Sequence, residues 1–142
     1  MNRNEFLRGL GLSTGAIVAT YCMGSLTSCE DRFAGVTPSG TIDFTLDLSN
    51  SSYSTLLNKG GWIRTQNVVI AHTPDDNYVA VTQICSHEGQ RQVGYRPSNN
   101  DFYCSAHGAL FDINGNGENA NGRRGIQVYN VSLEGTMLRV YS

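Results

Sequence analysis

Hydrophobic and polar residues alternate strictly in the segment TIDFTLDLS (41–49), where isoleucine, phenylalanine and two leucines are separated by threonine and aspartate. A period of two places the apolar side chains on one face of a β-strand and the polar side chains on the other. The segment therefore predicts a half-buried strand.

Two pairs of apolar runs predict β-hairpins. NVVIAHT (67–73) and YVAVTQI (78–84) flank the turn PDDN, and QVYNVSL (127–133) and MLRVY (137–141) flank a Glu134–Gly135 turn. Proline, aspartate, asparagine and glycine between apolar runs are typical of hairpin connections. No stretch after Cys29 has convincing helical periodicity. We therefore expect an all-β fold built from antiparallel strands.

Length and composition allow one domain. The chain has 142 residues, 39% of them hydrophobic, which supports a single modest core. The 10 basic and 12 acidic residues give a formal net charge of −2, without the clustered basic surface that nucleic-acid binding requires. We expect no nucleic-acid partner.

The first 28 residues have the pattern of an export signal. Arg3 and Arg8 make a basic start, and no charged residue follows between positions 9 and 28. The sequence LTSC that ends at Cys29 resembles the bacterial lipobox, which implies cleavage before this cysteine and a lipid on its sulfur. This interpretation divides the chain into a signal peptide (1–28), a lipidated cysteine with a polar tether (29–40) and a domain (41–142). The expected location is the periplasm or the outer face of a bacterial membrane, with the lipid as anchor.

Two questions stay open for the N-terminal segment. About 20 uncharged residues would just span a bilayer as an uncleaved helix, although glycine, serine and threonine dilute their hydropathy. The stretch RNEFLRG (3–9) is also similar to the twin-arginine export signal, but Asn4 stands where the second arginine is expected. The export route is therefore not fixed by the sequence.

Two short segments each combine a cysteine with a histidine. ICSHEG (84–89) contains Cys85 and His87, and CSAHG (104–108) contains Cys104 and His107, with 16 residues between His87 and Cys104. Both side chains ligate soft or borderline metals. A disulfide is the ordinary alternative for two cysteines in an exported chain, but it would not explain the histidine near each sulfur.

The pattern C-x-H, 16 residues, C-x-x-H, followed by Gly108 and LFD, resembles the Rieske iron-sulfur domain. The resemblance covers roughly residues 68–140 and implies a Rieske-like antiparallel β sandwich with a small cluster-binding subdomain. In that family two cysteines hold one iron of a [2Fe-2S] cluster and two histidines hold the other. It therefore implies Cys85 and Cys104 as ligands of the inner iron, and His87 and His107 as ligands of the outer iron. Structural zinc held by the same four residues is the alternative.

The chain departs from one branch of this family. Rieske subunits of quinol-oxidising cytochrome bc complexes carry an additional, disulfide-bonded cysteine in each loop, where this sequence has Gln90 and Ala106. They also carry a serine and a tyrosine whose hydroxyls hydrogen-bond to cluster sulfurs, where this sequence has Ala109 and Phe111. Such hydrogen bonds stabilise the reduced form and raise the reduction potential. Because this sequence lacks both hydroxyls, we expect a reduction potential below zero, in the lower part of the family range of roughly −150 to +300 mV.

The resemblance implies electron transfer and not stand-alone catalysis, because a cluster with a complete ligand set cannot bind substrate at iron. Rieske oxygenases use a separate iron held by two histidines and a carboxylate, whereas only His72 remains here. We expect a carrier, or a small subunit of a respiratory oxidoreductase complex. Its partners would be redox proteins such as a cytochrome, a quinol-oxidising enzyme or a molybdenum-type oxidoreductase.

Three other features have simpler expected roles. The segment NGNGENANGRRG (114–125) stands where the family often has a proline-containing loop, and its asparagine and glycine content predicts a mobile connection. His72 and Trp62 are expected to be structural residues of the β domain.

Overall fold

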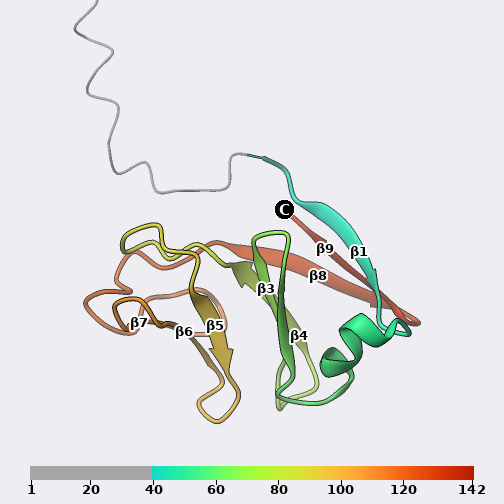
Figure 1. Ribbon diagram of the computed structural model, residues 1–142. Helices are drawn as coiled ribbons and strands as arrows, with labels where there is room; N and C mark the ends of the chain where they lie inside the picture. Colours follow the sequence, from blue (N-terminus) through green and yellow to red (C-terminus); the bar gives the residue numbers. More distant parts are fainter. Residues whose placement is uncertain (1–39) are drawn as a thin grey trace, which may run out of the picture. The chain divides into compact units, whose positions relative to one another are not determined.

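The computed structural model describes residues 40–142, so the predicted signal peptide, Cys29 and nearly all of the tether lie outside the described residues. The described part contains nine strands and one short 3-10 helix (Figure 1). In chain order these are β1 (Asp43–Asp47), η1 (Ser51–Leu57), β2 (Trp62–Thr65), β3 (Val68–His72), β4 (Tyr78–Thr82), β5 (Val93–Arg96), β6 (Asp101–Cys104), β7 (Ala109–Phe111), β8 (Val128–Glu134) and β9 (Met137–Tyr141).

The strands form two antiparallel sheets. The larger sheet has the order β1-β9-β8-β4-β3-β2, and the smaller has the order β5-β6-β7. Both predicted hairpins are confirmed, since β3 pairs with β4 and β8 with β9. The predicted strand in 41–49 is also confirmed as β1, which pairs with β9 from the far end of the domain. The all-β, antiparallel fold class is therefore correct.

Strand β3 lies between two hydrophobic cores, and all five of its residues are buried. Val69 and Ala71 belong to a core shared with the smaller sheet. Val68 and Ile70 belong to a second core, enclosed by β1, β8, β9 and η1. Because successive side chains point to opposite faces of a strand, a strand covered on both faces needs apolar residues at every position. This explains the uninterrupted apolar run in the sequence.

Helix η1 and the short strands β2 and β7 are among the elements that the sequence pattern did not predict. Helix η1 begins after Asn50, whose side chain accepts a hydrogen bond from the Ser52 N–H at 2.9 Å, and it buries Leu56 completely. Seven residues with one buried side chain give no helical periodicity, which is why the pattern did not indicate a helix. Strands β2 and β7 are only four and three residues long, too short for an alternation to be recognised.

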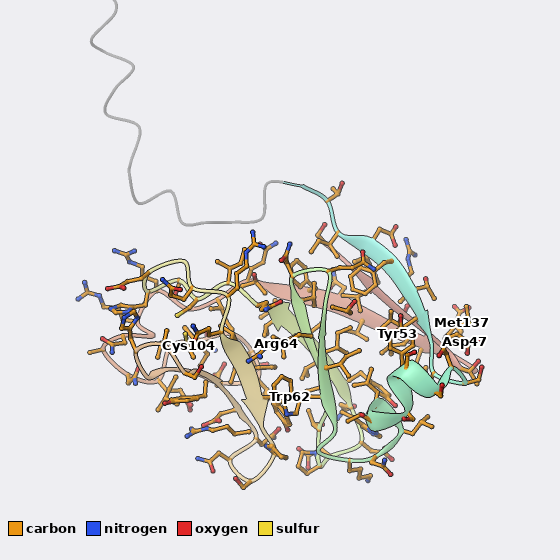
Figure 2. All side chains as sticks on the ribbon, in the orientation of Figure 1. Asp47, Tyr53, Trp62, Arg64, Cys104 and Met137 are labelled. Carbon is orange, nitrogen blue, oxygen red and sulfur yellow. The ribbon has the colours of Figure 1, made fainter. Side chains whose placement is uncertain are left out.

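The smaller sheet is an insertion between two neighbouring strands of the larger one. The chain leaves β4 after Thr82 and returns at Gln127, whose carbonyl accepts a hydrogen bond from the Thr82 N–H at 2.9 Å. Cys104, in the insertion, and Met137, in the larger sheet, lie at opposite ends of the domain (Figure 2). Within residues 40–142, no helix has the length and apolar character needed to cross a membrane.

An arginine and a tryptophan on β2 connect the two sheets. Figure 2 shows Trp62 and Arg64 beside β5. The Arg64 Nε atom donates to the Val93 carbonyl at 2.8 Å, and its guanidinium lies over the Trp62 ring at 5.1 Å. Trp62 packs against the core that contains Cys85 and Cys104. A structural role for this tryptophan therefore follows from its packing.

Candidate metal centre

The first cysteine–histidine segment forms a tight turn directly after β4. The Cys85 carbonyl accepts a hydrogen bond from the Gly89 N–H at 2.8 Å, and the Cys85 N–H donates to the Gln90 carbonyl at 2.8 Å. Gly89 has a φ of 71°, a left-handed conformation that glycine adopts without steric cost. The turn is therefore closed by its own backbone, with His87 at its tip.

The second segment forms a matching turn between β6 and β7. The Cys104 carbonyl accepts a hydrogen bond from the Gly108 N–H at 2.9 Å, and Gly108 has a φ of 75°. Cys104 pairs with Val93 of β5 and with Ala109 of β7, so the sheet fixes its position on both sides. The two turns share one backbone design, although one follows the larger sheet and the other belongs to the smaller.

The two histidine rings meet between these turns. Their centroids are 5.1 Å apart and their planes are inclined at 71°. The Nδ1 atom of His87 is buried and has no hydrogen-bond partner among residues 40–142. Because a buried polar atom without a partner is costly, this nitrogen is available to a ligand that the described residues do not supply.

A carboxylate that was not predicted as part of the site stands beside the second histidine. Glu88 Oε2 lies 3.3 Å from His107 Nε2, and the two side chains are 54% and 40% exposed. The histidine edge of the site is therefore open to solvent. The only sequence signal for Glu88 was its position directly after His87.

The two cysteines lie on the buried side of the site. Cys85 is 1% exposed and Cys104 is fully buried, and neither forms a disulfide. Burial, together with the neighbouring Cys104 thiol, raises the pKa of the Cys85 thiol to about 11, although backbone N–H groups of His87 and Glu88 point at the sulfur and act in the opposite direction. Without metal the Cys85 thiol is protonated at neutral pH, so metal binding there must release a proton.

The four predicted ligands are brought to one place, but they are not equally close. Among residues 40–142, the donor atoms that lie within 4.8 Å of one another in a group of three belong to His87, Glu88 and His107. Within the described part of the chain, no such group combines the two cysteine sulfurs with a histidine. A tetrahedral ion with bonds of about 2.0–2.3 Å holds its ligand atoms only about 3.3–3.8 Å apart. The sulfur pair and the nitrogen pair are therefore spread more widely than one ion requires.

The segment 114–125 differs from the mobile connection that its composition predicted. Its side chains and backbone make hydrogen bonds to the second turn and to β7, among them Glu118 N–H to the Leu110 carbonyl at 2.9 Å. Asparagine and glycine content does not reveal which amides find partners elsewhere in the chain, so the sequence pattern could not show this.

His72, the third histidine, lies outside the site. It is 6% exposed, stacks on Tyr78 at 4.4 Å and places Nδ1 2.9 Å from the Leu56 carbonyl. Its Nε2 atom lies 2.8 Å from Asp76 Oδ1. Both ring nitrogens therefore face hydrogen-bond acceptors of the protein, in keeping with the predicted structural role.

Comparison with known proteins gives two kinds of match. Residues 53–130 match the family model of the Rieske [2Fe-2S] domain. No curated protein matches the chain in a sequence comparison. Among solved structures, the ferredoxin of carbazole 1,9a-dioxygenase from Nocardioides aromaticivorans IC177 is 20% identical with a TM-score of 0.50, over 61% of this chain and 90% of that one. The cyanobacterial plasma membrane Rieske protein PetC3 from Synechocystis PCC 6803 is 24% identical with a TM-score of 0.49, over 58% of this chain and 85% of that one.

The ferredoxin structure is similar in fold, and the family match extends over more than half of the sequence, from within η1 to β8. The matched region contains both cysteine–histidine turns and the whole smaller sheet. The chain belongs to the Rieske [2Fe-2S] domain family, whose domain binds a [2Fe-2S] cluster.

Proposed function

We propose that Cys85, His87, Cys104 and His107 hold the [2Fe-2S] cluster of this domain, the cysteines on the inner iron and the histidines on the outer iron. The chemistry of the donors fits the group, since two thiols and two imidazoles are the ligand types of a Rieske centre. The Nδ1 atom of His87, which has no hydrogen-bond partner among the described residues, supports the assignment, because coordination to iron would satisfy this nitrogen.

The observation that carries this proposal is the separation of the sulfur pair from the nitrogen pair. The donor atoms of His87 and His107 lie within 4.8 Å of each other, while the described residues contain no comparably tight group that joins both sulfurs to a histidine. A centre with two metal ions needs two such pairs, whereas structural zinc needs four donors around one point. The spacing therefore favours the cluster over zinc.

Charge supports the same assignment. The cysteines lie in an apolar core with residues such as Phe102 and Phe111, where an isolated charge would be costly. With two ferric ions, two sulfides and two thiolates the oxidised centre is neutral, so it can lie against this core without a buried counter-ion. The imidazoles contribute no charge of their own.

When bound, the cluster supplies one-electron transfer. The buried cysteines hold the inner edge of the site against the core, and the half-exposed ring of His107 holds the outer edge at the surface, where a redox partner can approach. The Nε2 atom of His107 lies 3.3 Å from the exposed Glu88 carboxylate. These arrangements support a role as an electron carrier, or as a small redox subunit of a respiratory oxidoreductase complex.

We further propose that the domain is exported and tethered to a membrane through a lipid on Cys29. The support is the sequence pattern of residues 1–29, with a basic start, an uncharged stretch and LTSC at its end. A short polar tether would then keep the domain near the partners expected at a membrane, such as a cytochrome, a quinol-oxidising enzyme or a molybdenum-type oxidoreductase.

The test is to purify the full chain from an iron-replete host and measure iron, acid-labile sulfide and the EPR spectrum after reduction with dithionite. We expect two irons and two sulfides per chain and the spectrum of a reduced Rieske centre. Cys104→Ser should lose the sulfide, while Ser98→Ala, an exposed serine in the turn between β5 and β6, should keep it. Zinc without sulfide in the wild-type chain would overturn the proposal.

A further inference from the structure

Residues 112–125, which we call the third loop, form most of the connection between β7 and β8 and are held by hydrogen bonds where they leave β7. One oxygen of the Asp112 carboxylate accepts from the backbone N–H groups of Asn114 and Asn116, both at 2.8 Å. Phe111 also forms an isolated β-bridge with Gly117. The loop therefore starts from a fixed point directly after β7.

Asn119 joins the third loop to the second cysteine–histidine turn. Its Nδ2 atom donates to the Gly108 carbonyl at 2.7 Å. Its Oδ1 atom accepts from the Leu110 N–H at 3.1 Å and from the Gly122 N–H at 2.8 Å. The side-chain amide of Asn119 thus makes hydrogen bonds to three backbone groups, and two of these groups belong to the segment that follows His107.

The side-chain amide of Asn121 makes a hydrogen bond to the second cysteine–histidine turn itself. Asn121 Nδ2 donates to the carbonyl of His107 at 2.7 Å. On the other side of the site, Arg124 Nη1 lies 3.5 Å from the carbonyl of Ser86, in the first turn. The third loop therefore contacts both turns, and its shortest contacts are the two amides on the second turn.

The path of the third loop leaves these amides little freedom. A Cβ atom at Gly117 would lie 1.9 Å from the Gly122 carbonyl oxygen, and one at Gly122 would lie 2.2 Å from the Leu110 carbonyl oxygen. Backbone segments approach this closely only because both residues lack a side chain. The loop packs as a layer on β7, which holds Asn119 and Asn121 facing the second turn.

We propose that Asn119 and Asn121 are positioning residues for cluster binding, which fix the second turn through the carbonyls of Gly108 and His107. The proposal rests on the ligand set proposed above. The Cys85 turn follows β4, whose last three residues are buried, whereas the second turn lies between the short strands β6 and β7 and receives these amides instead. Without them, the His107 side chain keeps its neighbours but loses a defined backbone position, so the cluster is held less tightly.

The experiment compares three variants of the full chain, each loaded with cluster. Asn121→Ala removes the donor to the His107 carbonyl. Asn119→Asp keeps the acceptor for Leu110 and Gly122 but removes the donor to Gly108. Asn114→Ala is the matched control, since it is exposed in the same loop and its side chain makes no hydrogen bond within residues 40–142. The rate of cluster loss to an excess of iron chelator and the EPR line widths are measured for all four proteins.

We expect cluster loss about 10- to 100-fold faster in Asn121→Ala and Asn119→Asp than in wild type, the range seen when partners of metal ligands are removed. Their EPR lines should also broaden, because the second turn adopts more than one arrangement, and Asn114→Ala should match wild type. Release rates and line widths that match wild type in both test variants would overturn the inference, as would equal acceleration in the control. If wild type itself contains no acid-labile sulfide, the proposed function fails first. If Asn119→Asp does not fold, Asn121→Ala decides alone, because it removes one exposed hydrogen bond.

Discussion

Two glycines of the cluster-bearing insertion should respond differently to the same substitution. Gly108 ends the second turn with a φ of 75°, and a Cβ atom there would meet nothing within 4 Å. Gly122, in the third loop, does not have a positive φ, but its Cβ would lie 2.2 Å from the Leu110 carbonyl oxygen and 3.1 Å from the carbonyl carbon. Alanine is therefore opposed by backbone conformation at Gly108 and by a steric clash at Gly122.

The expected losses of stability follow from these two causes. A left-handed conformation costs a non-glycine residue about 1–2 kcal/mol, so Gly108→Ala should lose about that much. At Gly122 the opposing atoms belong to the backbone of β7 and cannot rotate away. Overpacking costs about 1–3 kcal/mol, and each hydrogen bond broken as the loop moves adds about 0.5–1.5 kcal/mol. Loss of the two hydrogen bonds that Asn119 accepts from Gly122 and Leu110 brings the expected total to roughly 2–6 kcal/mol.

The measurement is urea unfolding of metal-free residues 40–142 with reduced cysteines, followed by circular dichroism. Asparagine tolerates the left-handed region, so Gly108→Asn should recover part of the loss, while Gly122→Asn should recover none. The slope of the unfolding free energy against urea should stay constant, which shows that the same surface is exposed in each variant. A loss at Gly122 no larger than that at Gly108, or no recovery with asparagine at Gly108, would refute this reasoning.

Three further predictions concern the lipid at Cys29, the reduction potential and the pH dependence of stability. Cys29→Ser should move the protein from the membrane fraction to the soluble fraction, and unchanged fractionation would argue against a lipid at this residue. A redox titration should give a midpoint below zero, and a value well above about +100 mV would contradict the role assigned to the missing hydroxyls at Ala109 and Phe111. The hydrogen-bonded Arg139 guanidinium lowers the pKa of the Asp43 carboxyl in the folded protein. The pair therefore stabilises the fold at pH values above about 3.9, the pKa of aspartate in the unfolded chain. This contribution is lost as the pH falls through the lower pKa that Asp43 has in the folded protein. Asp43→Asn should therefore unfold at lower urea than wild type at pH 6, and the difference should shrink toward pH 2; a difference independent of pH would exclude this ion pair as its cause.

Sequence patterns predicted those parts of the fold whose signal is local. The hairpins β3–β4 and β8–β9 follow from alternation, apolar runs and turn residues that lie within about a dozen positions of one another. Helix η1 depends instead on Asn50 as a cap and on Leu56 filling a distant core, and β7 is only three residues long. Neither leaves a periodic pattern.

The residues of the site also fall into those that the sequence predicted and those that it did not. Cys85, His87, Cys104 and His107 were predicted as ligands because their residue types and spacing are rare in combination, and the fold brings them to one place. Glu88 and the two amides of the third loop were not predicted as neighbours of the site. An exposed glutamate or an asparagine is common in any loop, and its partner is a carbonyl or an imidazole many residues away. Only the folded chain shows which of these polar groups meet.

The insertion leaves and re-enters the larger sheet at one point, where Thr82 donates to the carbonyl of Gln127 and Val81 pairs with Val128. Since the two ends are neighbours, the length of the inserted segment does not alter the register of the strands that carry it. The segment that carries both cysteine–histidine turns can therefore change in length while the larger sheet stays unchanged.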